Sequence, residues 1–279
     1  MRFFITLKEK LFVEKQLKRG NIIPLLKYIA LRLRVSHFFF LHRIEYRMRV
    51  WFAPYAFWLW NHEQYVREDE LFFSRFLQEG DVVVDAGAHL GTLTMTASKH
   101  VGKTGRVIAC EPHPKTYQYL SRNIKDNYCS NVMLHNVAVG DISHNVYMTS
   151  HYVSDMNRVT DSGTVKVSMS TLDDLLKDEE HITLLKLDVE GYELPALMGA
   201  KQILAKTDAV YFESAALSFK ERGYSLSDII TLLKECGFTT YKQEDNFALQ
   251  EIGLDHITKE RYENLIALKD ATLYTSRII

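Results

Sequence analysis

The chain has 279 residues, of which 47% are apolar and 25% are charged, a composition typical of globular proteins and not of disordered ones. Its formal net charge of −1 excludes a strongly basic nucleic-acid-binding protein. Three scattered cysteines, Cys110, Cys129 and Cys236, match neither a disulfide framework nor a zinc site, so we expect a reducing compartment.

The first 60 residues differ in charge from the rest of the chain. They contain 12 lysines and arginines but only 3 acidic residues, whereas the other 219 residues contain 22 basic and 32 acidic groups. Apolar spacing predicts helices over 3–18 and 22–34, followed by an aromatic-rich passage over 38–65 with Trp51, Trp58 and Trp60. Interspersed charges argue against a signal peptide, and the apolar run 50–60 is shorter than the roughly 20 residues of a membrane span. We therefore expect a cytoplasmic protein.

From residue 81 onward, short β-branched runs alternate with helical stretches. The pattern predicts strands over 82–86, 106–110, 131–139, 183–189, 208–214, 238–243 and 264–269, and helices over 92–100, 114–127, 171–177, 191–205 and 225–236. Residues 141–149 and 164–168 are expected to form extra strands or a hairpin. This order predicts an α/β fold, with an open, mostly parallel, Rossmann-like sheet of seven strands and helices on both faces.

Two short motifs follow the first two strands, where ligands bind in open α/β sheets. The first, DAGAHLG, spans 85–91 and includes Asp85, Gly87 and Gly91; the second, EPHP, begins at Glu111. The spacing G-x-x-x-G departs from the G-x-G-x-x-G of dinucleotide sites, and Asp85 would repel a pyrophosphate. An acid there suits an ammonium group, and an acid after the second strand accepts ribose hydroxyls. Together they favour S-adenosylmethionine as cofactor.

The chain resembles the FkbM-type S-adenosylmethionine-dependent methyltransferases. Five blocks match in order: VVVDAGAHLGTLT, GRVIACEPHPKTYQYLSRNI, VSMSTLDDLL, LLKLDVEGYELPALMGAKQIL and VYFES. The resemblance covers about residues 80–269 and implies a class I methyltransferase fold and methyl transfer to a hydroxyl. It departs from the family at His89, where asparagine is usual. We expect a helical N-terminal appendage over 1–66 and a methyltransferase domain over 67–279.

Site residues follow from these motifs. We expect Asp85 at the amino-acid end of the cofactor, Glu111 at the ribose and the end of the third strand at the adenine; the full cofactor set is Asp85, Gly87, Ala88, His89, Gly91, Glu111, Pro112, Asn136 and Ala138. On the acceptor side, Lys186 and Asp188 share one face of the fourth strand.

Asp188 is then either the base that accepts the hydroxyl proton or a cap of the following helix. Lys186 either orients Asp188 and keeps it ionised or pairs with a surface acid. The expected catalytic residues are Asp188, Lys186 and Glu190. Glu190 and Glu213 are expected to bind sugar hydroxyls. A minority alternative is a divalent metal on Asp188, Glu190 and Glu213, although no metal is the main expectation.

The expected function is O-methylation of a sugar, glycan or related natural-product acceptor, with no nucleic-acid partner. Two alternatives stay open: a nucleotide-dependent oxidoreductase and a non-catalytic S-adenosylmethionine-binding module. The basic N-terminal appendage is either a cap over the acceptor cleft or a peripheral contact with the inner membrane surface, since basic groups between apolar ones are typical of interfacial helices.

Overall fold

The computed structural model describes residues 7–33, 35, 38–50, 54–62, 67–149, 157–160, 163–244, 246–257 and 262–278. Trp51 and the first residues of the expected helix 3–18 lie outside the described residues, as does the side chain of Trp58.

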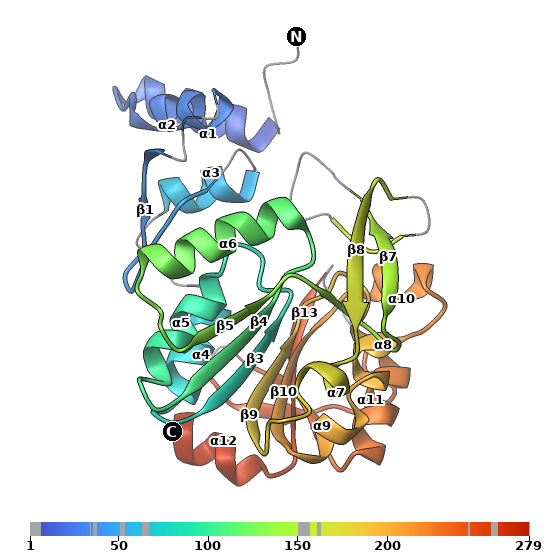
Figure 1. The fold of residues 1–279 in the computed structure, drawn as a ribbon. Helices are drawn as coiled ribbons and strands as arrows, with labels where there is room; N and C mark the ends of the chain where they lie inside the picture. Colours follow the sequence, from blue (N-terminus) through green and yellow to red (C-terminus); the bar gives the residue numbers. More distant parts are fainter. Residues whose placement is uncertain are drawn as a thin grey trace.

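A central sheet of eight strands forms the middle of the molecule (Figure 1). Its order is β12-β11-β13-β10-β9-β3-β4-β5, and the five strands from β10 to β5 are parallel to one another. The sequence analysis expects seven strands in this sheet. The eighth is β12, a three-residue edge strand that it does not predict. The bounds are Val82–Ala86 (β3), Arg106–Cys110 (β4), Val132–His135 (β5), Ile182–Leu187 (β9), Thr207–Ser214 (β10), Thr239–Gln243 (β11), Leu249–Glu251 (β12) and Glu263–Leu268 (β13).

The expected strand 131–139 is two strands. After β5 the chain leaves the central sheet, and β6 (Ala138–Val139) pairs with β8 (Val165–Ser170) in a small three-stranded sheet. Asn136 lies at the break, and its amide donates hydrogen bonds to the carbonyl oxygens of Glu111 and Pro112. The antiparallel pairing of β7 (His144–Met148) with β8 confirms the expected hairpin.

Helices cover both faces of the central sheet, because successive strand residues point to opposite sides. Val84 packs toward α8 (Glu193–Met198), α9 (Lys201–Ala205) and α11 (Leu226–Glu235). Val83 packs toward α4 (Glu68–Phe76), α5 (Thr92–His100) and α12 (Ala271–Ile278). The remaining helices of this part are α6 (Pro114–Asp126), α7 (Leu172–Leu175) and α10 (Ala216–Glu221).

The expected helix 191–205 is broken into α8 and α9 at Gly199. A Cβ on Gly199 would lie 2.1 Å from the carbonyl oxygen of Gly140, so only glycine fits at the break. Pro195 lies in the first turn of α8, as expected, where its missing N–H is harmless.

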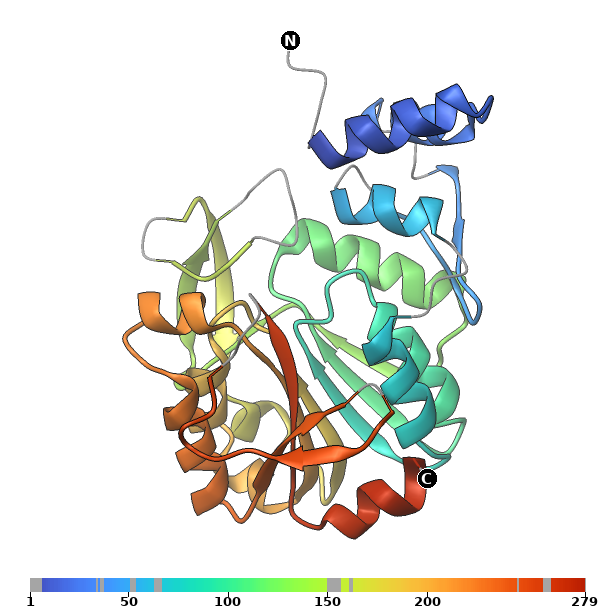
Figure 2. The same ribbon diagram turned by 180° about the vertical axis from the view of Figure 1, so that it is seen from behind.

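The N-terminal part packs against the outer side of α6. It consists of α1 (Leu7–Lys18), α2 (Ile23–Arg32), the hairpin β1 (Leu41–His42) and β2 (Arg47–Met48), and α3 (Pro54–Asn61). Leu31 and Phe57 share an apolar cluster with Leu120 of α6, and Arg49 pairs with Asp126 at 2.7 Å. Both ribbon views place α1 and α2 outermost, beyond α3 (Figures 1 and 2). In the described residues, every helix is too short or too polar to cross a membrane.

Candidate active site

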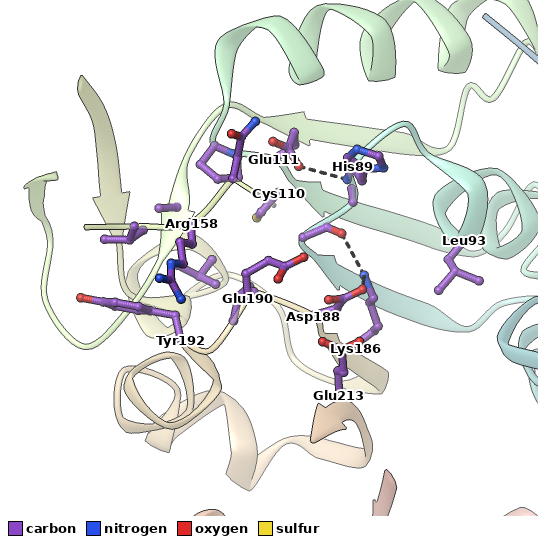
Figure 3. A pocket seen from close by; sticks show the side chains of 18 of the residues that line it. His89, Leu93, Cys110, Glu111, Arg158, Lys186, Asp188, Glu190, Tyr192 and Glu213 are labelled. Atoms are coloured by element: carbon purple, nitrogen blue, oxygen red, sulfur yellow. Dashed lines mark hydrogen bonds and ion pairs between the residues drawn. The ribbon is translucent and has the colours of Figure 1, made fainter. Parts of the chain in front are cut away.

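A cavity of about 230 Å³ opens at the carboxyl ends of β3, β4, β9 and β10, beside the three-stranded sheet (Figure 3). Parallel strands bring their carboxyl ends to one edge, which is why motifs far apart in the sequence meet here. Ten of the expected site residues line it: Gly87, Ala88, His89, Glu111, Pro112, Ala138, Lys186, Asp188, Glu190 and Glu213.

The loop after β3 touches the end of β9 without room for a side chain. Gly87 has a φ of +82°, and a Cβ there would lie 1.8 Å from the carbonyl oxygen of Asp188. The amide N–H of Asp188 donates to the carbonyl oxygen of Ala86 at 3.1 Å. These contacts form a narrow backbone cradle on one side of the cavity.

Replacement of Gly87 by alanine is expected to lower the free energy of unfolding by about 3 kcal/mol, the sum of left-handed strain and a backbone collision. Gly237→Ala is the matched control, because Gly237 has a φ of +86° but open space around its Cβ position. In the control, the free energy of unfolding should fall by only about 1 kcal/mol, the cost of the left-handed conformation. Urea unfolding of both variants measures the difference; equal losses would contradict a tight cradle.

Glu111 follows β4 and lies beside the loop that forms the cradle (Figure 3). Its two carboxylate oxygens accept hydrogen bonds from the backbone N–H groups of His89 (3.0 Å) and His113 (2.9 Å). Burial raises the pKa of Glu111 to about 7, although these two N–H groups pull in the opposite direction. Burial also lowers the pKa of His89 to about 4, so its imidazole is neutral. The carboxylate is therefore fixed in place, with lone pairs left for a ligand.

Lys186 joins the two strands at the centre of the site. In the parallel pair β3–β9, Lys186 is the register partner of Asp85, and its Nζ lies 3.1 Å from Asp85 Oδ1 and 3.5 Å from Asp188 Oδ2. The same Nζ donates to the carbonyl oxygen of Gly87 at 2.9 Å. Burial alone would lower the pKa of Lys186, but the charges of Asp85 and Asp188 raise it above its ordinary value. The lysine is therefore a buried permanent cation.

Asp85 lies behind the cavity wall and not in it. The residue is 1% exposed and is absent from the lining, since Lys186 stands in front of its Oδ1 and the hydroxyl of Thr94 donates to its Oδ2. The structure thus places Lys186 between Asp85 and the cavity, and a direct contact of Asp85 with the cofactor stays a prediction.

Gly91 and Asn136 also lie outside the lining. Gly91 starts α5 with a φ of +93°, and Asn136 holds the backbone that follows β4. In the structure both residues support the loops that form the wall, and their contact with the cofactor stays a prediction.

Three carboxyl groups face the cavity from β9, the following loop and β10: Asp188, Glu190 and Glu213. The side chain of Asp188 is 41% exposed. Burial, the largest cause, and the charges of Asp188, Glu190 and Glu193 raise the pKa of Glu213 to about 9. Its carboxyl group is therefore protonated at neutral pH and has an O–H to donate. Among the described residues no group of three His, Cys, Asp or Glu side chains is arranged to hold a metal.

The loop between β9 and α8 is held by a buried glutamate that the sequence analysis missed. Glu193 accepts the N–H of Val189 at 3.0 Å, which fixes the turn where Glu190 and Gly191 have φ values of +55° and +89°. The N-cap of α8 is Tyr192, so Asp188 does not cap this helix. The alternative structural role of Asp188 is therefore wrong.

Other lining residues also escaped the sequence analysis. Arg67 and Asp69 come from the start of α4, and Arg158 from the segment before β8. The acidic run 68–70 is a helix-start signal that predicts α4, whereas no local pattern marks Arg158. Of the described residues, those before Arg67 do not line the cavity, so the described N-terminal part does not cap it.

A family model, the Methyltransferase FkbM domain, matches residues 85–240, which is more than half of the chain. Ribosomal RNA large subunit methyltransferase E of Buchnera aphidicola is 37% identical over 93 residues, covering 29% of this chain and 43% of that protein. Hexuronic acid methyltransferase AglP of Haloferax volcanii is 26% identical over 167 residues, covering 58% of this chain and 65% of that protein. The chain thus spans less than two thirds of either relative.

Similar solved structures include a methyltransferase FkbM from Methylobacillus flagellatus, with 18% identity, a TM-score of 0.45 and coverage of 76% of this chain and 53% of that chain. A second is an S-adenosylmethionine-dependent O-methyltransferase from Thermotoga maritima, with 13% identity, a TM-score of 0.45 and coverage of 83% and 85%. By the matched domain and its α/β sheet, the chain belongs to the FkbM methyltransferase family, with the class I methyltransferase fold and S-adenosylmethionine as cofactor.

Proposed function

We propose that this protein transfers the methyl group of S-adenosylmethionine to a hydroxyl of a sugar, glycan or related hydroxylated acceptor. The observation that carries the proposal is the division of one cavity between a backbone cradle with Glu111 and a wall with Asp188, Glu190 and Glu213. Carboxyl groups bind and deprotonate hydroxyls. Residues 67–279 are proposed as the methyltransferase domain and residues 1–66 as an appendage.

The residues on the cradle side fit the cofactor. Glu111 keeps lone pairs for the two ribose hydroxyls, and the backbone from Gly87 to His89 approaches closely because Gly87 lacks a side chain. Ala138 lines the wall beyond Glu111, where we place the adenine. Pro112, which follows Glu111, also lines this part of the cavity. Asp85 holds Lys186 in place.

On the acceptor side, we assign Asp188 as the base. When bound, the cofactor supplies an activated methyl group, so the protein has to position the acceptor oxygen and remove its proton. Lys186 Nζ lies 3.5 Å from Asp188 Oδ2 and holds this carboxylate in place. Glu213 donates a hydrogen bond in its protonated form, and Glu190 accepts one. Together these groups position a polyhydroxylated acceptor.

Glu111→Gln is expected to weaken binding of S-adenosylhomocysteine about tenfold, because an amide accepts one fewer hydroxyl than a carboxylate. The affinity of the wild-type protein should rise with pH through about 7, the pKa of Glu111, because hydroxyl donors favour the ionised form. The affinity of the variant should lack this rise. Isothermal titration between about pH 6 and 8 measures both; a rise retained in the variant would assign it to another group.

The acceptor is tested by transfer of a labelled methyl group to defined hydroxylated compounds. The relative named as a hexuronic acid methyltransferase supports an acidic sugar. The lining residue Arg158 pairs with Glu221 through Nη1, and its guanidinium has further N–H groups for the carboxylate of such a sugar. The RNA methyltransferase relative matches only 29% of this chain. We expect label in oligosaccharides that contain a hexuronic acid and none in short RNA.

Label in RNA alone would refute the sugar acceptor. Binding of S-adenosylhomocysteine without transfer to any acceptor would favour the non-catalytic module. Membership of the FkbM family leaves the nucleotide-dependent oxidoreductase without support.

A further inference from the structure

Helix α2 carries two apolar stripes on opposite sides, and only one of them is buried. Tyr28 and Leu31 face the cluster shared with α3 and α6. The second stripe has helical spacing, and its side chains are between 41% and 67% exposed: Ile22, Leu26, Ile29 and Leu33. A helix that buries one apolar stripe normally exposes a polar one on the opposite side. The second stripe therefore needs a partner.

Further exposed apolar side chains lie on α1 and α2, which are in contact with each other. Leu11 and Leu17 of α1 and Ile23 at the start of α2 are also more than 40% exposed. We call these three residues and the second stripe of α2 the apolar face. Soluble monomers rarely expose so many large apolar side chains in one region, and such patches mark interaction sites.

The charge around the apolar face is strongly positive. Residues 7–33 contain seven lysines and arginines but two glutamates. Three exposed cations lie at the end of α1: Lys15, Lys18 and Arg19. Among the described side chains of residues 7–33, Glu14 is the acidic one. Cations next to apolar side chains complement an anionic surface that has an apolar interior, because the cations bind headgroups while the apolar residues enter the acyl layer.

We propose that the apolar face of α1 and α2, with its cations, docks on an anionic phospholipid bilayer. A second copy of this chain is the less favourable occupant, because a symmetric dimer would bring two faces of the same positive charge together. Both ribbon views place α1 and α2 at the outermost end, so a flat bilayer reaches them without meeting the sheet. Docking is independent of the proposed acceptor, since the apolar face shares no residue with the cavity lining.

Vesicle flotation of the full chain tests the proposal. The wild-type protein should float with phosphatidylcholine vesicles that contain about 30% phosphatidylglycerol, and not with pure phosphatidylcholine, at low salt. Leu26→Glu with Ile29→Glu should reduce vesicle affinity at least about tenfold, since both side chains then resist burial. Leu217→Glu with Leu254→Glu is the matched control, because these leucines are at least as exposed and lie elsewhere on the molecule. It should float like the wild-type protein.

A second variant tests the cations. Replacement of Lys15, Lys18 and Arg19 by glutamine should lower affinity for the anionic vesicles about a hundredfold at low salt. Titration with S-adenosylhomocysteine should show unchanged binding in all variants, which verifies that they are folded. Absence of flotation with anionic vesicles would overturn the proposal, as would wild-type flotation of the Leu26 and Ile29 variant. Light scattering that shows a dimer dissociated by that variant would overturn it in favour of a second copy.

Discussion

Lys186→Met is expected to lower the free energy of unfolding by about 3–5 kcal/mol, the usual cost of leaving one partner of a buried ion pair alone. Asp85 is 1% exposed and has Lys186 Nζ at 3.1 Å, so its carboxylate would lose its nearest cation without gaining water. The variant would also lose the hydrogen bond to the carbonyl oxygen of Gly87 at 2.9 Å. Urea unfolding at neutral pH measures the loss.

Two further variants separate this cause from simple loss of packing. Adding Asp85→Asn to Lys186→Met should restore most of the stability, because a neutral amide costs less to bury than an unpaired carboxylate. Lys99→Met is the surface control, since Lys99 pairs with Glu45 at 3.0 Å in an exposed position and should cost at most about 1 kcal/mol. A double variant no more stable than Lys186→Met would show that the charge pair is not the cause.

Some elements were predicted to the residue because local signals sufficed. The runs VVVDA and RVIAC form β3 and β4 with the expected bounds, since continuous β-branched and apolar residues are typical of buried parallel strands. The helix over 92–100 was also predicted correctly, because Gly91 stands before it with a φ of +93° and Gly102 follows. The shared face of Lys186 and Asp188 followed from strand alternation and is confirmed.

The ion pair between Asp85 and Lys186 was not predicted, because it depends on the order of the strands in the sheet. The sequence places Asp85 at the end of its strand, but β9 is the fourth strand expected from the sequence and lies beside β3 only through a crossover. That neighbourhood makes Lys186 the register partner of Asp85 and covers the carboxylate. A local motif does not contain this information. The division of the expected strand 131–139 has the same origin, since Asn136 bonds to the backbone after a neighbouring strand.

Asp188→Asn is expected to lower kcat about 10²–10⁴-fold, because an amide does not accept the proton of the acceptor hydroxyl. The substitution preserves shape and leaves the cradle at Gly87 intact, since that contact is with the backbone carbonyl of Asp188. Titration with S-adenosylhomocysteine should therefore give the affinity of the wild-type protein. Full activity would remove Asp188 as the base, and a matching loss of affinity would indicate a cofactor contact.

Glu213→Gln is the matched control for this experiment. Burial and the neighbouring carboxylates raise the pKa of Glu213 to about 9, so at neutral pH its carboxyl group is protonated and already neutral. An amide replaces a neutral hydrogen-bond donor with another one, and kcat at neutral pH should change little. Since Asp188 and Glu213 line the same cavity, a large loss at Asp188 alone would identify the ionised carboxylate, and not carboxyl groups in general, as the proton acceptor.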